Sequence, residues 1–323
     1  MKKYNDPLAL GRADPYIYKH TDGYYYFTAT YPAYDRICIR RAKTINGLTD
    51  AEEKVIWRKH ETGVMASHIW APELHYIDGK WYIYFAAGEH ENIWEIRPYV
   101  LECADADPIG GTWTEMGMMQ ALTPPDENTI NGYDRYSFTD FSLDMTTFEH
   151  RGRRYCIWAE KVGRRFGISN LYIAEMSAPN KLKTVQVLLT TPDYDWERID
   201  FWVNEGPAVL KHGGKIFVTY SASATGQMYC MGMLMADENA DLLDPRSWSK
   251  KRYPVLQTDP AKKVFGPGHN SFTVGENGET LCILHYRDYS DEHISGDPLN
   301  NPDRHAHVLE VQFDENGEPV FKL

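Results

Sequence analysis

Paired cysteines, long apolar runs and clusters of basic residues are all missing from this chain of 323 residues. None of the five cysteines forms a Cys-x-x-Cys pair, which excludes zinc-ribbon and thioredoxin-like sites. No run of 18 apolar residues occurs, so we expect no membrane-spanning segment. These absences leave an ordinary globular protein with a full apolar core as the broad class.

Two features bear on the compartment in which the protein works. The first residues, MKKYNDPLAL, lack the apolar core of a signal peptide. Four of the five cysteines lie in apolar, strand-like runs, where an unpaired thiol behaves as a small hydrophobe and fits a reducing compartment. We therefore expect a cytoplasmic protein, or a secreted one if a signal peptide has been removed.

The charge of the chain is acidic, with a formal net value of −12. Nucleic acids require clustered Lys and Arg, so a nucleic acid is not expected as a partner. Aromatic residues make up 13% of the chain, with 22 Tyr and 9 Trp, which suits both the packing of β-sheets and stacking on sugars. A neutral substrate fits this composition best.

A short phrase recurs five times along the chain. Each copy has a polar residue, an alternating apolar run, a glycine turn and an aromatic or β-branched strand, which is the signature of a β-hairpin. The turn glycines of the five copies are Gly23, Gly79, Gly152, Gly214 and Gly278. Internal repeats of this kind indicate a repeat architecture.

The repeat length favours an all-β, five-bladed β-propeller. The steps between equivalent positions are 57, 73, 61 and 64 residues, enough for four short strands and their loops. Segments 105–140 and 288–305 are rich in Asp, Pro, Gly and Asn and are expected to be long loops. We predict a single propeller domain over residues 1–323; a large sandwich is the alternative, but it would not place like residues at like positions.

Acid–base residues occupy one position of the repeat. Eight or nine residues before the turn glycines stand Asp14, Ala71, Asp144, Glu205 and His269. In a propeller these positions converge on the central axis, so the three carboxyl groups and the imidazole are expected to share one pocket. Repulsion and burial then separate the carboxyl pKa values into an acid and a base, as hydrolysis of a glycosidic bond requires. Alternatively, each of these carboxylates only caps backbone amides or pairs with a basic residue.

The chain resembles glycoside hydrolase family 43, the five-bladed propellers that act on arabinofuranosides and xylosides. The resemblance is carried in order along the whole chain by Arg12–Pro15, Trp70–Glu73, Leu143–Asp144, Glu205–Pro207 and Gly266–Ser271. It implies an inverting mechanism with Asp14 as general base, Glu205 as general acid and Asp144 as the carboxylate that raises the pKa of the acid. The third segment has Leu-Asp-Met where many members have Ile-Asp-Pro, so Asp140 competes with Asp144.

Residues beside these blade positions in the sequence, and an arginine that the resemblance gives, are candidates to bind the substrate. Trp70 and Trp202 are candidates for stacking on the sugar, with core packing as the alternative for each. Asn204 is a candidate donor to a hydroxyl group, and either Arg287 or Arg304 is expected to bind vicinal hydroxyl groups.

Metal binding is a separate question. No cofactor is expected to be required, but the resemblance allows a structural calcium ion on the propeller axis beside His269. Because calcium prefers oxygen ligands, an imidazole that bonds to a carboxylate is the alternative. The pair His305 and His307 on one strand is a further metal candidate, although a solvated strand face is the simpler interpretation.

We therefore predict an exo-acting α-L-arabinofuranosidase that cleaves arabinan or arabino-oligosaccharides, with a neutral oligosaccharide as its partner. A β-xylosidase or an endo-arabinanase of the same fold is the alternative among enzymes. A carbohydrate-binding propeller without catalysis is the alternative from another class. The sequence does not assign the oligomeric state.

Overall fold

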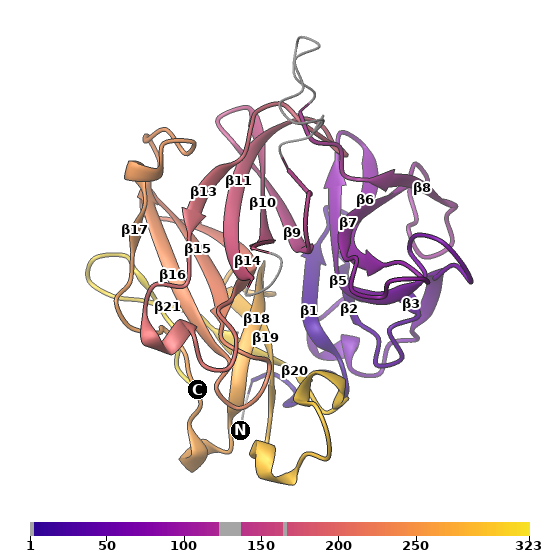
Figure 1. Ribbon diagram of the computed structural model, residues 1–323. Coiled ribbons are helices and arrows are strands. Elements are labelled where there is room, and N and C mark those ends of the chain that lie inside the picture. The colour runs from indigo at the N-terminus through magenta and orange to yellow at the C-terminus, as the bar shows by residue number, and fades with distance from the viewer. Residues whose placement is uncertain (1–2, 123–136, 164–166) are drawn as a thin grey trace.

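The computed structural model describes residues 3–122, 137–163 and 167–323, and the regular secondary structure of these residues consists almost entirely of strands (Figure 1). The first sheet contains β1 (Ala13–Lys19), β2 (Tyr25–Thr30), β3 (Arg36–Ala42) and β4 (Lys54–Arg58). The second contains β5 (Ser67–Ile77), β6 (Lys80–Gly88), β7 (Arg97–Cys103) and β8 (Trp113–Met118). The third contains β9 (Ser142–His150), β10 (Arg153–Val162), β11 (Ile168–Ala178), β12 (Lys181–Leu182) and β13 (Val187–Thr190).

The remaining sheets follow in chain order. The fourth contains β14 (Asn204–His212), β15 (Lys215–Ala222), β16 (Cys230–Asp237) and β17 (Ser249–Lys250). The fifth contains β18 (Phe265–Val274), β19 (Thr280–Arg287) and β20 (His305–Glu310), and the hairpin of β21 (Gln312–Phe313) and β22 (Pro319–Val320) follows it. Short 3₁₀ turns lie in the connections: η1 (Asn46–Leu48), η3 (Asp195–Glu197), η4 (Pro245–Ser247), η5 (Pro260–Lys262), η6 (Asp291–His293) and η7 (Pro298–Asn300).

The five sheets form a ring. The inner strands contact one another in the order β1, β5, β9, β14, β18, and β18 contacts β1 again. The ring is also joined at its edge, because Leu8 and Ala9 exchange backbone hydrogen bonds with Ala306 on β20, at 2.8 Å for the Leu8 amide. The prediction of a five-bladed β-propeller is confirmed.

The predicted glycine turns lie between the first and second strands of each blade. Two-residue hairpin turns of the type that matches strand twist need positive φ at both central residues. Asp78 and Gly79 have φ of 50° and 86°, and Gly213 and Gly214 have 57° and 76°. The repeat in the sequence is therefore a repeat of hairpins.

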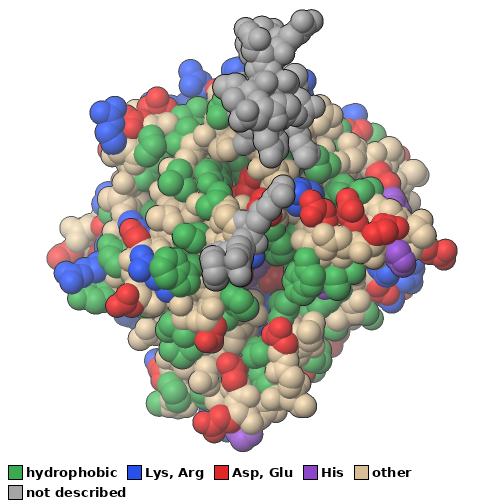
Figure 2. All heavy atoms as spheres, in the orientation of Figure 1, with side chains coloured by type: hydrophobic (Ala, Val, Ile, Leu, Met, Phe, Trp, Pro, Cys, Tyr) green, Lys and Arg blue, Asp and Glu red, His purple; other side chains and the backbone are tan. Residues whose placement is uncertain are grey.

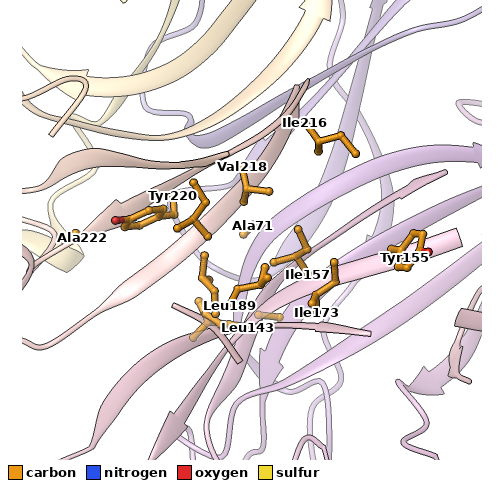
Figure 3. Close-up of a cluster of buried hydrophobic side chains, with 14 of the residues drawn as sticks. Ala71, Leu143, Tyr155, Ile157, Ile173, Leu189, Ile216, Val218, Tyr220 and Ala222 are labelled. Carbon is orange, nitrogen blue, oxygen red and sulfur yellow. The ribbon is translucent and has the colours of Figure 1, made fainter. Parts of the chain in front are cut away.

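The core is divided among the blade interfaces. Between the third and fourth blades, Ile157 and Ile173 pack with Val218 and Tyr220, all fully buried (Figure 3). All five cysteines are buried free thiols. In the described part of the chain, no helix is long and apolar enough to cross a lipid bilayer.

Every inner strand contains the same β-bulge. In β1, for example, Asp14 and Pro15 lie opposite the single residue Ala29 of β2, between the pairs Ala13–Thr30 and Tyr16–Thr28. The first residue of each bulge has positive φ, between 44° and 55°: Asp14, Ala71, Asp144, Gly206 and His269. Left-handed backbone is strained for residues other than glycine and is found at functional sites.

Candidate active site

The bulge corrects one equivalence inferred from the sequence. Glu205 was aligned with Asp14, Asp144 and His269, but Gly206 is the left-handed residue of the fourth blade. Glu205 pairs with Ser221 before the bulge, as Ala13 pairs with Thr30 in the first blade. Glu205 stands nine residues before Gly214, whereas Gly206 stands eight residues before it, the same offset as Ala71 and Asp144 have from their turn glycines, so the sequence alone allowed either alignment.

Asp14 lies at the centre of a cationic environment and is only 8% exposed. Its Oδ1 lies 3.1 Å from Nδ1 of His269 and 3.8 Å from Nη1 of Arg304, and its Oδ2 accepts a hydrogen bond from the Thr30 hydroxyl at 2.5 Å. Burial opposes ionisation, but the charges of His269 and Arg304 outweigh it and hold the pKa of Asp14 well below its usual range. Asp14 is therefore a carboxylate at any working pH.

Asp144 is also buried, but its pKa moves in the opposite direction. Its Oδ2 accepts the Gly206 amide at 3.0 Å and lies 3.8 Å from Nδ1 of His269. Burial raises the pKa of Asp144 well above its usual value, and the negative charges of Glu205 and Asp14 raise it further. The competitor Asp140 instead accepts the amide of its own neighbour Phe141, at 2.8 Å.

Glu205 is the third carboxyl group, on the strand that also carries the Asp144 partner Gly206. Its Oε1 accepts a hydrogen bond from the Tyr229 hydroxyl at 2.8 Å. Burial raises the pKa of Glu205, and the charge of Asp14 adds to the rise. The site thus holds one ionised carboxylate and two carboxyl groups that retain protons to higher pH, which is the division required of a base and an acid.

His269 joins the carboxyl groups to one another. Burial alone would lower the pKa of this imidazole, but the charges of Asp14, Asp144 and Glu205 raise it to about 10. Its backbone amide donates to the Ser221 hydroxyl at 2.7 Å. An imidazolium that stays charged at neutral pH explains how several buried acids share one pocket.

Gly206 gives the imidazole room, which leads to a prediction. A Cβ on Gly206 would lie 3.1 Å from Cγ of His269, and the backbone at Gly206 has φ of +54°. We expect Gly206→Ala to lower the free energy of unfolding by about 1–2 kcal/mol through backbone strain and also to reduce kcat by displacing His269. Thermal unfolding and steady-state kinetics measure the two effects.

The matched control is Gly278→Ala in the β18–β19 turn. Gly278 has φ of +87° with no atom within 4 Å of an added Cβ, so the same strain arises far from the site. We expect Gly278→Ala to lower the free energy of unfolding and to leave kcat unchanged. Equal kcat for the two variants would contradict the role of the Gly206–His269 contact.

Two residues of the site, His285 and Tyr229, were not predicted from the sequence. His285 accepts the Asp14 amide on Nδ1 at 3.0 Å, and burial with the charge of Arg304 lowers its pKa well below the usual value, so it is neutral. Tyr229 stacks on the His285 ring at 5.8 Å. His285 and Tyr229 lie on or beside the second and third strands of their blades, outside the repeated phrase, so no motif marked them.

Trp70 lies within an aromatic cluster. Its ring is 8% exposed and lies 4.4 Å from the His68 ring, with Trp94 at 6.1 Å and half exposed. Its indole N–H is buried and has no hydrogen-bond partner among the described residues. Trp202, in contrast, is 44% exposed, with the guanidinium of Arg198 at 4.4 Å over its ring. Trp70 therefore combines packing with an unpaired donor.

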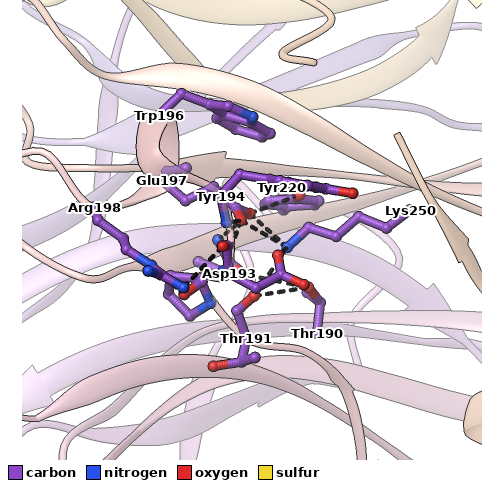
Figure 4. A network of polar contacts seen from close by, with 12 residues as sticks. Thr190, Thr191, Asp193, Tyr194, Trp196, Glu197, Arg198, Tyr220 and Lys250 are labelled. Atoms are coloured by element: carbon purple, nitrogen blue, oxygen red, sulfur yellow. Dashed lines mark hydrogen bonds and ion pairs between the residues drawn. The ribbon is translucent and has the colours of Figure 1, made fainter. Parts of the chain in front are cut away.

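Asn204 does not present its amide to the site. The residue is fully buried, its Nδ2 donates to Glu197 at 2.9 Å, and its Oδ1 accepts from Thr190 at 3.3 Å. Glu197 is itself held by Lys250 and Tyr220 in the network of Figure 4. The structure does not support hydroxyl binding by Asn204, because both ends of the amide are used to anchor the strand that carries Glu205.

The two candidate arginines differ in their surroundings. Arg287 is buried and donates to Asn301 at 3.0 Å and to the backbone carbonyls of Thr225 and Pro298, so it anchors loops. Arg304 is the arginine that lies beside Asp14, and its Nε is buried without a partner among the described residues. The geometry favours Arg304 over Arg287 as a ligand-binding group.

The described residues do not fit a calcium ion. Within residues 3–122, 137–163 and 167–323, no three His, Cys, Asp or Glu side chains are grouped to hold a metal. Nδ1 of His269 lies 3.1 Å from Oδ1 of Asp14, which is the bond to a carboxylate that was the alternative to calcium binding. At the other candidate, His305 accepts the Gly11 amide at 3.0 Å and His307 bonds to Asp6. Calcium on the axis is therefore not supported by the donor set.

The face shown in Figure 2 is hollowed near its centre, close to where the inner strands converge in Figure 1, and acidic side chains are visible inside the hollow. A five-bladed propeller that gathers carboxyl groups of opposite pKa shifts on its axis has the architecture and the chemistry of a glycoside hydrolase. The chain belongs to the glycosyl hydrolases family 43, whose model matches residues 4–319.

Characterised relatives and a solved structure are similar over nearly the whole chain. The extracellular exo-α-(1→5)-L-arabinofuranosidase of Streptomyces avermitilis is 50% identical over 99% of this chain, which spans 63% of the length of that relative. The enzyme of the same name from Streptomyces chartreusis is 50% identical over 91% of this chain and 85% of its own length. The crystal structure of α-L-arabinofuranosidase from Lactobacillus brevis matches with a TM-score of 0.89 and 52% identity, covering 99% of this chain and 96% of that one.

These relatives correct the expected location. The expectation of a cytoplasmic protein rested on unpaired cysteines and on the first ten residues, whereas both Streptomyces relatives are named extracellular. Buried thiols explain the discrepancy, because a cysteine that is enclosed in the core is protected from oxidation in any compartment.

Proposed function

We propose that this protein is an inverting, exo-acting α-L-arabinofuranosidase that releases arabinose from α-1,5-linked arabino-oligosaccharides or arabinan. The observation that carries the proposal is the opposed ionisation of Asp14 and Glu205 around one imidazolium. Half of the residues are identical to those of two enzymes that carry this specificity in their names, which supports the substrate.

The mechanism assigns one proton transfer to each carboxyl group. Asp14 is ionised and takes a proton from a water molecule, whose oxygen attacks the anomeric carbon. The bond from that carbon to the leaving oxygen breaks, and Glu205 gives its proton to this oxygen. Attack from the face opposite the leaving group inverts the anomeric configuration. No cofactor has a part in this scheme.

The remaining groups hold the sugar and tune the acid. The unpaired indole N–H of Trp70 and the guanidinium of Arg304 are donors suited to furanose hydroxyl groups. The half-exposed Trp94 and Trp202 offer apolar surfaces for stacking on further sugar units. Asp144 and Glu205 repel each other when both are ionised, so the pair keeps a proton to higher pH than either carboxyl group would alone.

Replacement of Asp144 by asparagine should move the basic limb of the kcat/KM profile to lower pH. Two carboxyl groups that repel each other lose their second proton at a raised pKa; with asparagine at position 144 this repulsion is gone, so the pKa of Glu205 falls, by about one unit. The profile is measured on α-1,5-arabinobiose. Asp140→Asn is the matched control and should leave the limb in place; a limb that moves only in the Asp140 variant would assign the third carboxyl group to Asp140.

The substrate assignment is tested with purified protein on three ligands: α-1,5-arabino-oligosaccharides, 4-nitrophenyl α-L-arabinofuranoside and 4-nitrophenyl β-D-xyloside. We expect arabinose to appear one unit at a time from the first and little release from the xyloside. Preference for the xyloside would indicate a β-xylosidase, and early internal cleavage an endo-arabinanase. Binding without cleavage of any ligand would leave only a carbohydrate-binding propeller.

A further inference from the structure

Tyr229 contacts the proposed acid and so far has no role in the chemistry. It lies just before β16 and is 1% exposed. Its hydroxyl donates to Oε1 of Glu205 at 2.8 Å. A general acid has two chemically identical oxygens, and only the one that faces the leaving group is useful for transfer.

The direction of the hydrogen bond between Tyr229 and Glu205 is fixed by the groups around Tyr229. Ser221 Oγ accepts the His269 amide at 2.7 Å, so its own proton is available to another acceptor. Ser221 also hydrogen-bonds to Tyr229, and burial keeps the pKa of Tyr229 well above its usual value although this bond lowers it. Tyr229 is therefore a neutral phenol that accepts from Ser221 and donates to Glu205.

The ring of Tyr229 is held in place by its packing. It is parallel to the His285 ring, with 2° between the planes and 5.8 Å between the centroids. Gly268, which pairs with His285 in the β18–β19 ladder, leaves space for the ring, because a Cβ there would lie 2.4 Å from the Tyr229 ring. The hydroxyl consequently reaches Glu205 from a fixed position.

We propose that Tyr229 is a positioning residue that occupies Oε1 of Glu205 and thereby assigns the transferred proton to Oε2. A carboxyl oxygen that accepts a hydrogen bond is the one without the proton. As the proton leaves Oε2, negative charge develops on Glu205, and the bond from Tyr229 becomes charge-assisted and stronger. The bond therefore stabilises the transition state more than the bound substrate. This inference rests on the proposed function.

Tyr229→Phe removes the hydroxyl and keeps the ring. Substrates with poor leaving groups need complete proton transfer, so we expect kcat on α-1,5-arabinobiose to fall about 10- to 100-fold, with KM little changed. The leaving group 4-nitrophenol needs little protonation, so the loss on its arabinofuranoside should stay below about threefold. The basic limb of the profile on arabinobiose should move to higher pH, because the lost bond favoured the ionised form of Glu205.

Tyr84→Phe is the matched control, since the Tyr84 hydroxyl is equally buried but donates to the Pro179 carbonyl at 2.7 Å in the core. We expect no difference between the two substrates in this variant. Ser221→Ala is a second test and should give a smaller loss with the same substrate preference. The inference would be overturned if Tyr229→Phe and Ser221→Ala each lost the same fraction of kcat on both substrates. It would also be overturned if the basic limb of the pH profile did not move in these variants. If the wild-type protein cleaves neither substrate, the proposed function fails instead.

Discussion

Glu205→Ala should lose activity in proportion to how much the leaving group needs a proton. On α-1,5-arabinobiose we expect kcat/KM to fall about 10³-fold, within the range for removal of a general acid. On 4-nitrophenyl α-L-arabinofuranoside the loss should be at most about tenfold, because a nitrophenolate leaves without protonation. The basic limb of the pH profile should also disappear on the aryl substrate, since the group that titrates there is gone.

The contrast between substrates separates chemistry from folding. A variant that merely destabilised β14 would lose activity on both substrates alike. Trp202→Ala changes an exposed neighbour on the same segment and serves as the control, with an expected change in KM and no preference for the aryl substrate. If kcat/KM of Glu205→Ala on arabinobiose fell only tenfold or less, Glu205 would be excluded as the general acid.

Asp14→Asn should abolish turnover of both substrates to a similar extent. An amide cannot take the proton of the attacking water, whatever the leaving group, so we expect kcat/KM to fall by about 10³-fold or more on arabinobiose and on the aryl arabinofuranoside. The variant also removes the partner at 3.1 Å that keeps His269 charged. The pKa of His269, observed by NMR, should therefore fall from about 10.

Asp22→Asn is the matched control for Asp14 in the same blade. The Asp22 carboxylate accepts bonds from the Tyr24 amide at 2.8 Å and the Tyr26 hydroxyl at 2.7 Å, within its own hairpin. We expect full activity from this variant. Substantial turnover by Asp14→Asn on either substrate would exclude Asp14 as the base.

The fold was predictable because hairpin chemistry is local. Asp78-Gly79 and Gly213-Gly214 require left-handed turns that few other residue pairs adopt, and the strands beside them alternate in polarity, so each blade is marked in the sequence. The bulge was not predictable. It depends on the pairing of two strands, and it places Gly206 where simple counting had placed Glu205.

Site residues that belong to the repeated phrase were predicted from the sequence, and site residues outside it were missed. Asp14, Asp144 and His269 meet within 3.8 Å because they occupy one position of the repeat. Tyr229 and His285 reach the same place from neighbouring strands, where nothing in the sequence distinguishes them from core aromatics. Arg287 and Arg304 could not be separated either, because one ends a strand and the other stands just before the next strand, and only packing decides which guanidinium faces Asp14.

The most direct test of the proposed mechanism is the configuration of the sugar that is released first. Wild-type protein is mixed with an α-L-arabinofuranoside, and the anomeric proton of the product is followed by NMR before mutarotation. An ionised Asp14 that activates water opposite a protonated Glu205 predicts β-L-arabinose as the first product. First release of the α-anomer would show retention, and would contradict the assignment of Asp14 as a base acting through water.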